Sequence, residues 1–138
     1  MSDPILHLRL YGRRPGLNEI VSADRTARMA GARLKANETR AVAMAARNLK
    51  PIPGGFWLFV WMEPNRRRDP DNIAAGGVKV IFDGLQDAGI IRRDGWEQVR
   101  GLLNAQVIDK ARPGVLVECY AHADDCAAAW LEWEVKRE

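Results

Sequence analysis

The chain has few of the residues that sulfur and imidazole chemistry require. It contains two cysteines and two histidines among 138 residues. Cys119 and Cys126 do not have the spacing of metal ligands, and His7 and His122 are far apart in the sequence. We interpret both cysteines as reduced packing residues of a cytoplasmic protein, with a disulfide between them as the alternative. His7 is expected on the exposed face of a strand rather than at a metal.

Signals for membranes and for several common enzyme classes are also missing. No apolar run is long enough to span a bilayer. The start Met1-Ser2-Asp3-Pro4 lacks the basic and apolar regions of a signal peptide. There is no Gly-rich phosphate loop of the Walker type and no nucleophile elbow. We therefore expect no membrane partner and no organic cofactor. The length suits one domain over residues 1–138, with 122–138 as a C-terminal extension of uncertain structure.

The first half of the chain predicts a strand, a long helix and a second strand. Residues 5–11 alternate, with Leu6, Leu8 and Leu10 on one face. Residues 22–48 are rich in helix formers, and Ser22 is a suitable N-cap. Residues 56–63 are apolar on both faces, which indicates a central strand. We expect two helices to cover one face of this strand and a second subunit to cover the other.

The second half predicts a helix followed by two strands. The helix is expected from Asp71 to about Ala88, with a loop or kink at 74–77 because Gly76-Gly77 weakens it, and with Ala88-Gly89 as its stop. Residues 102–109 and 115–121 are expected to form a hairpin joined by 110–114. The tail is either a short helix over 127–131 or a strand in which Leu131, Trp133 and Val135 alternate with polar residues.

These elements define a fold class. Their order is β-α-β-α-β-β, which predicts an α/β, two-layer fold. A small mixed four-stranded sheet carries two helices packed on one face.

Charged residues gather where the second strand meets the second helix. The segment reads Arg66-Arg67-Arg68-Asp69-Pro70-Asp71-Asn72, and Lys79, Asp83, Asp87 and Asp94 follow. Carboxylates bind divalent metal ions and arginines bind phosphates. A metal ion beside a phosphodiester polarises it and lowers the pKa of the attacking water. Residues 1–70 hold 13 Lys/Arg against 6 Asp/Glu, and residues 71–138 hold 8 Lys/Arg against 12 Asp/Glu. This distribution suits a protein whose basic half binds a polyanion and whose acidic half binds a metal ion.

Plainer interpretations of the same residues remain open. The segment is also a reasonable solvated turn, with Asp71 as the N-cap of the following helix. Lys79, Asp83 and Asp87 are four residues apart and share one helix face, as in a solvent-facing ladder of ion pairs. Trp57, Phe59 and Trp61 are interpreted as core residues, with a stacking platform for bases as the alternative.

The ordered set of motifs resembles a known family. It consists of Asp69-Pro70-Asp71-Asn72, Lys79, Asp83-Gly84-Leu85, Ala88-Gly89 and Asp94, preceded by the turn Pro15-Gly16-Leu17-Asn18. It is similar to that of the RusA-type endodeoxyribonucleases, Holliday junction resolvases common in bacteriophages and prophages. The resemblance covers about residues 5–121. It implies an α/β fold of the kind described above, a homodimer, and metal-dependent hydrolysis of branched DNA, above all four-way junctions.

Two positions depart from the family pattern. Lys79 follows Asp71 by eight residues, about one helical turn more than in the best-known members. Arg93 stands where many members carry the first of two adjacent aspartates, so the resemblance carries over only the second, Asp94.

The candidate site follows from these motifs. Asp69, Asp71 and Asp94 are predicted to bind Mg²⁺, with Mn²⁺ as a substitute and Asp83 as a further ligand. Lys79 is predicted to stabilise charge on the transferring phosphate, so that Asp69, Asp71, Lys79 and Asp94 are the catalytic residues. The residues expected to contact DNA are Arg66, Arg67, Arg68, Arg13, Arg14 and Asn18. The alternatives are a non-catalytic DNA-binding module of resolvase-like fold and a structural or adaptor protein.

Overall fold

The fold is built on a mixed four-stranded sheet. The computed structural model describes residues 2–12, 22–23 and 29–137. Its elements are β1 (Leu6–Tyr11), α2 (Ala30–Ala46), β2 (Gly55–Glu63), α3 (Pro70–Asp87), β3 (Val99–Ile108), β4 (Gly114–Tyr120) and α4 (Ala123–Lys136). The predicted α/β class, the mixed four-stranded sheet and the order of its elements are confirmed, and a further helix follows the last strand.

The order of the strands in the sheet differs from the predicted hairpin. The sheet runs β1-β4-β2-β3, with β4 antiparallel to both of its neighbours and β2 parallel to β3. The segments 102–109 and 115–121 are therefore both strands, but they do not pair, because β2 lies between them. β2 is the most apolar strand of the chain, and a central position buries both of its faces.

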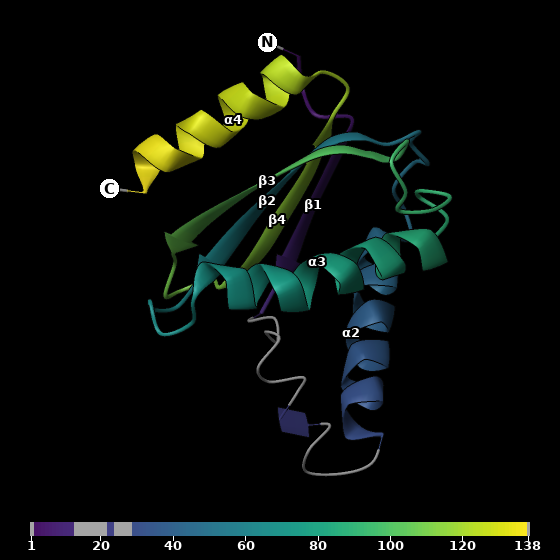
Figure 1. Ribbon diagram of the computed structural model, residues 1–138, viewed down its shortest axis with the longest axis vertical. Helices are drawn as coiled ribbons and strands as arrows, with labels where there is room; N and C mark the ends of the chain where they lie inside the picture. The colour runs from purple at the N-terminus through teal and green to yellow at the C-terminus, as the bar shows by residue number, and fades with distance from the viewer. Residues whose placement is uncertain (1, 13–21, 24–28, 138) are drawn as a thin grey trace.

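The helices form a layer on each side of the sheet (Figure 1). On one side α2 and α3 cover Trp57, Phe59 and Trp61 of β2. On the other side α4 covers Leu58 and Val60. The cover that was expected from a second subunit is thus supplied by the chain's own tail, and the expected two layers become three.

The tail adopts the helical one of its two predicted conformations. Cys126 of α4 is buried, Trp130 and Trp133 pack against the sheet, and the Trp130 indole donates a 2.8 Å hydrogen bond to the carbonyl of Asn104 in β3. Asp124 and Asp125 lie in the first turn of the helix, where they complement the positive end of its dipole.

Helix α3 is continuous through its two glycines, so the predicted loop or kink at 74–77 is wrong. A Cβ atom on Gly77 would lie 2.4 Å from the indole of Trp61, which shows that the glycine lets the helix approach the sheet. The helix starts one step earlier than predicted: Asp69 occupies the N-cap position, Pro70 begins the helix, and Asp71 lies in the first turn.

The end of α3 is the predicted glycine stop. Gly89 has φ 75°, and the amides of Gly89 and Ile90 donate to the carbonyls of Gln86 and Leu85. These two bonds form a Schellman motif, which turns the chain into the segment leading to β3.

Helix α2 begins at Ala30, whereas the sequence predicted one helix from Ser22 to about Asn48. Ser22 and Ala23 are helical, but Met29 has φ 72°. A left-handed residue cannot continue a right-handed helix, so the two helical segments are separate. The tight packing of α2 on α3 depends on Gly84, where a Cβ atom would lie 2.5 Å from that of Val42.

Candidate functional site

A pocket opens where β2 and β3 end and α3 begins. It has a volume of about 170 Å³. β2 and β3 are parallel, so their carboxyl ends meet at this edge of the sheet. The residues that line it come from the ends of these strands, the 64–69 loop, the start of α3 and the end of α4: Glu63, Asn65, Arg66, Arg68, Asp69, Pro70, Ile73, Gln106, Val107, Ile108 and Arg137.

A buried ion pair forms one wall of the pocket. The Arg68 guanidinium donates to both carboxylate oxygens of Glu63, through Nε at 2.8 Å and Nη2 at 2.7 Å. The two side chains are 9% and 8% exposed. Glu63 is the last residue of β2, on the same face of that strand as Trp61. A carboxylate at this depth needs a partner, and Arg68 supplies it.

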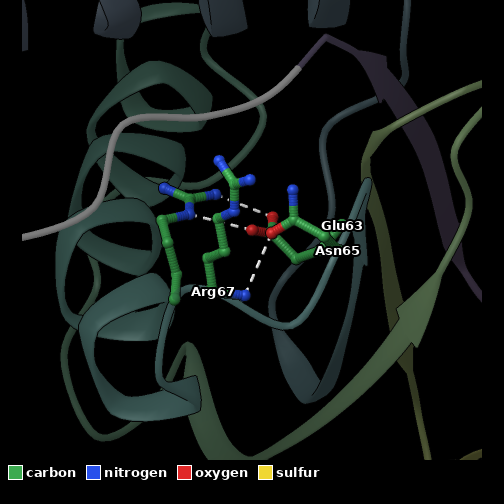
Figure 2. Close-up of polar contacts among 4 residues, drawn as sticks. Glu63, Asn65 and Arg67 are labelled. Carbon is green, nitrogen blue, oxygen red and sulfur yellow. Dashed lines mark hydrogen bonds and ion pairs between the residues drawn. The ribbon is translucent and has the colours of Figure 1, made fainter.

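The neighbouring arginines face solvent. Arg66 and Arg67 are exposed, and the amide of Arg67 donates a 3.0 Å hydrogen bond to the side chain of Asn65. Figure 2 shows Glu63, at the end of β2, close to Asn65 and Arg67 of the loop that leads from β2 to α3. The bond that the Arg67 amide donates to Asn65 tightens this loop, in which Arg66 and Arg68 line the pocket.

Asp69 and Asp71 stand at the start of α3. Asp69 is the N-cap residue and Asp71 lies in the first turn, and both are exposed. Only Asp69 lines the pocket. The helix dipole favours negative charge at both positions, so these carboxylates are stable in the absence of a cation.

A second charged group lies further along α3. The Lys79 ammonium contacts Asp83 at 3.1 Å and Asp94 at 2.9 Å. The hydrogen bond to Asp94, and then that to Asp83, raises the pKa of Lys79 above its usual range. Lys79 is therefore a cation at any physiological pH. Of the predicted ladder, the structure contains the Lys79–Asp83 pair; the second partner of Lys79 is Asp94, seven residues after the helix, and Asp87 forms no ion pair with another described residue.

The structure places the predicted site residues in two groups. Asp69, Asp71 and the arginines surround the start of α3, whereas Lys79, Asp83 and Asp94 lie near its middle. Lys79 is eight residues beyond Asp71, a rise of about 12 Å along the helix axis. Over residues 2–12, 22–23 and 29–137, no three acidic, histidine or cysteine side chains are gathered as a metal site. Arg13, Arg14 and Asn18 lie outside the described residues.

Sequence reasoning missed Glu63 and a glutamine that lines the same pocket. Glu63 ends a run of seven apolar residues, Phe56 to Met62, and such a residue resembles the first polar position outside the core. The period of two along the strand was the available signal, because it places Glu63 on the face of Trp61, toward α3. Gln106, from β3, lines the same pocket.

Another buried carboxylate lies on the opposite face of the sheet. Glu118 of β4 accepts a 2.9 Å hydrogen bond from the Tyr120 hydroxyl and lies 2.8 Å from Nδ1 of His7. Burial, together with the bond to Glu118, raises the pKa of Tyr120. His7 is exposed, as predicted. Cys119 and Cys126 are buried and free, which confirms their interpretation as packing residues.

No family model matches the chain, and no curated protein matches it. None of the helices in the described part of the chain has both the length and the apolar character that a membrane crossing requires.

Proposed function

We propose that the protein is a metal-dependent endodeoxyribonuclease that cuts branched DNA, above all four-way junctions, as a homodimer. The observation that carries the proposal is the pocket at the start of α3, where acidic and cationic side chains lie on adjoining walls. Glu63 and Asp69 line the pocket and would supply oxygen ligands to a metal ion, and Arg66 and Arg67 are exposed in the loop between them. The motifs from Asp69 to Asp94 that resemble the RusA-type enzymes support the same function.

The residues of the pocket suit Mg²⁺ in chemical type. Magnesium binds hard oxygen ligands, and one or two carboxylates suffice when water and substrate phosphates complete its shell. Glu63 and Asp69 both line the pocket, and Asp71 follows in the first turn of α3. Glu63 and Asp69 would hold the ion, and Asp71 would join them only when the ion binds, because no three carboxylates of the described residues are gathered as a metal site. The bound ion would activate water and polarise the phosphate. Mn²⁺ suits the same ligands.

The cation that now pairs with Glu63 is Arg68. Its guanidinium balances a buried negative charge, the role that a divalent ion would take. In the proposed site the arginine turns from Glu63 to a phosphate of the bound DNA, for which its planar donor fork is well suited. Arg66 and Arg67 contact neighbouring phosphates and position the strand.

Lys79 and Asp94 contribute at a distance from this pocket. Lys79 keeps its charge because Asp83 and Asp94 hold it, and we assign it to a phosphate on the DNA that lies along α3. Asp94 orients the lysine. This assignment differs from a direct metal-ligand role for Asp94, which would require the segment after α3 to move toward Asp71.

A homodimer fits the symmetry of the substrate. A four-way junction has twofold pseudosymmetry, and paired cuts require two active sites. The outer side of α4 exposes Leu131 and Val135, which are 56% and 79% exposed, and this supports α4 as part of the subunit contact. Sedimentation that finds only monomer at micromolar concentration would count against paired cutting.

A second candidate is a DNA-binding module without catalysis. The observation that favours it is that Arg68 already neutralises Glu63, while Lys79 neutralises Asp83 and Asp94. A chain with all these pairs intact still holds phosphates through its exposed arginines.

One experiment separates the candidates. The protein is incubated with a labelled four-way junction, with and without Mg²⁺, and analysed on denaturing and native gels. Symmetrical metal-dependent nicks support the nuclease. A mobility shift without nicks supports the binding module, and the absence of both supports a structural or adaptor protein.

Substitutions test which carboxylate is involved. Asp71→Asn is expected to abolish cleavage and to leave junction binding intact or stronger. Asp87→Asn removes the same charge from an exposed position near the other end of α3 and serves as the matched control. Cleavage by Asp71→Asn at the wild-type rate would show that the assignment is wrong.

A further inference from the structure

Trp96 is the most exposed large apolar side chain among the described residues, at 96%. Trp57 and Trp61 are fully buried, and Trp130 and Trp133 pack against the sheet. The buried indoles also use their N–H groups: Trp57 donates to Gln98 and Trp61 to Asn104. An indole left entirely in water forgoes a large part of the free energy that its burial would release, and such side chains are enriched at binding surfaces.

The turn that carries Trp96 is fastened on both sides. Two residues before it, Asp94 holds the ammonium of Lys79 on α3 at 2.9 Å. Two residues after it, the carbonyl of Gln98 accepts bonds from the Trp57 indole at 2.8 Å and from the amide of Gly55 at 3.0 Å. Within the turn, the amide of Val99 donates to the carbonyl of Gly95 at 2.9 Å. The indole is therefore displayed on a fixed backbone, which lowers the entropy lost on binding.

The charges around this turn favour an anionic partner. Arg92 and Arg93 are exposed, and no carboxylate among the described residues forms an ion pair with either of them. Asp94 is already neutralised by Lys79, which leaves Glu97 as the acid nearest to the indole in sequence. Two exposed guanidinium groups, three and four residues before an exposed aromatic ring, are features by which proteins bind single-stranded nucleic acid.

We propose that Trp96 stacks on an unpaired base, while Arg92 and Arg93 hold the phosphates on either side of it. The inference rests on the proposed function and names the part of a branched substrate that this loop contacts: the strand that is unstacked where the arms meet. Arg66 and Arg67 precede the start of α3, whereas Asp94, next to Arg93, is held by Lys79 near the middle of the helix. Lys79 lies nine residues beyond Pro70, a rise of about 14 Å along the helix axis, so the two groups of arginines are placed to contact separate parts of one DNA molecule.

The test measures binding in EDTA, so that cleavage plays no part in it. Labelled four-way junction, single-stranded oligothymidine and a paired duplex are titrated with the wild type, Trp96→Ala and Trp96→Phe. Stacking of a base on an aromatic ring predicts that Trp96→Ala weakens binding to the junction and to the single strand by about five- to a hundredfold. Trp96→Phe is expected to recover most of this loss, and duplex binding to stay unchanged. Met44→Ala, which removes an exposed apolar side chain from α2, is the control.

The salt dependence separates stacking from charge. Trp96→Ala is expected to leave the slope of log affinity against log salt unchanged. Arg92→Gln with Arg93→Gln is expected to lower the slope on single strands by about 0.7 for each phosphate that the variant no longer neutralises. Equal affinity of the wild type and Trp96→Ala for every substrate would overturn the inference.

Fluorescence identifies the occupant of the loop directly. Acrylamide quenches the emission of an exposed indole, and Trp96 is the one with the greatest access. Protection from quenching on addition of oligothymidine supports base stacking. Protection that appears without DNA, as the protein concentration rises, shows that a second copy of the chain covers Trp96, and this overturns the inference. If a base stacks on Trp96 but the junction is not cut, the inference stands and the proposed nuclease activity fails. If the junction is cut but Trp96→Ala changes neither binding nor cleavage, the nuclease activity stands and the inference fails.

Discussion

Arg68 and Glu63 meet through two hydrogen bonds of 2.8 and 2.7 Å in a place where both side chains are more than nine-tenths buried. Each residue therefore determines the environment of the other. A single substitution leaves a charge with its partner removed, and the following two predictions depend on this.

Removal of the acid is expected to destabilise the fold. Glu63→Gln removes the carboxylate that pairs with the Arg68 guanidinium, and the loss of one member of a buried pair costs about 3–5 kcal/mol. Urea denaturation measures the loss. Asp87→Asn, at an exposed position, is the matched control and is expected to change the free energy of unfolding by less than about 0.5 kcal/mol. Equal stability of the two variants would show that the pair is open to water in solution.

Removal of the arginine is expected to favour metal binding. Arg68→Met frees the Glu63 carboxylate while keeping an unbranched side chain of similar length, so Mg²⁺ and Mn²⁺ bind more tightly in a calorimetric titration. Arg67→Met removes the same charge from an exposed position in the same loop and controls for net charge. An equal gain in metal affinity in both variants would show that the effect comes from long-range charge and not from competition between Arg68 and the metal ion for Glu63.

The exposed arginines are expected to set the salt dependence of DNA binding. Arg66→Gln with Arg67→Gln should weaken binding to every duplex sequence and lower the slope of log affinity against log salt by about 0.9 for each phosphate that is no longer neutralised. Arg47→Gln, just after the last turn of α2, serves as the control. An unchanged slope in the double variant would show that Arg66 and Arg67 do not contact DNA phosphates.

The cysteines predict a loss of stability in alkali. Burial raises the pKa of Cys119 to about 12 and that of Cys126 to about 11, from an ordinary value of 9.0. Above pH 9 the unfolded chain loses these protons while the folded chain keeps them, so the free energy of unfolding falls as the pH rises from 9 toward 12. Urea denaturation at pH 8 and pH 10.5 measures the fall, and Cys126→Ala is expected to make it shallower. The same burial predicts slow reaction of both thiols with a disulfide reagent at pH 8.

Gly77 tests the contact between α3 and the sheet. Alanine is the better helix former by about 1 kcal/mol, but its Cβ atom would lie 2.4 Å from the Trp61 ring. Overpacking costs about 1–3 kcal/mol, so Gly77→Ala is expected to destabilise the protein in thermal denaturation. In a Trp61→Leu background the same substitution is expected to be neutral or stabilising. A stabilising effect in the wild-type background would show that the helix can move away from the sheet.

The elements of the fold could be predicted because their signals are local. Alternation identified β1, the apolar run identified β2, and Gly89 marked the end of α3. The pairing of strands was out of reach, because a turn between β3 and β4 has the same local residues whether or not another strand lies between them. The kink expected at Gly76-Gly77 failed for a related reason: the helix propensity of glycine is a local property, whereas the packing of Gly77 on Trp61 is tertiary.

The candidate site was predictable in its residue types and less so in its arrangement. The cluster from Arg66 to Asp71 was visible because its charges are adjacent in the sequence. Glu63 follows an apolar strand and was not recognised as a site residue. Its pairing with Arg68 depends on the conformation of the loop between them, which the sequence does not specify. Asp94 was expected beside Asp71. The sequence pattern does not indicate how far the segment after α3 extends back along the helix toward Asp71. In the structure Lys79 holds Asp94 near the middle of the helix.

The place of β4 between β1 and β2 has a consequence for how the chain folds. β1 and β2 never touch, and each pairs with β4, which is made from residues 114–120. Residues 1–113 contain three of the four strands of the sheet but can join only β2 to β3. The completed sheet must wait for the synthesis of residues 114–120, and then closes through contacts between distant residues, which are slow to form. Until that moment the edge of β2 is open to pairing with other chains, so a truncation before residue 114 is expected to aggregate rather than to fold into a smaller domain.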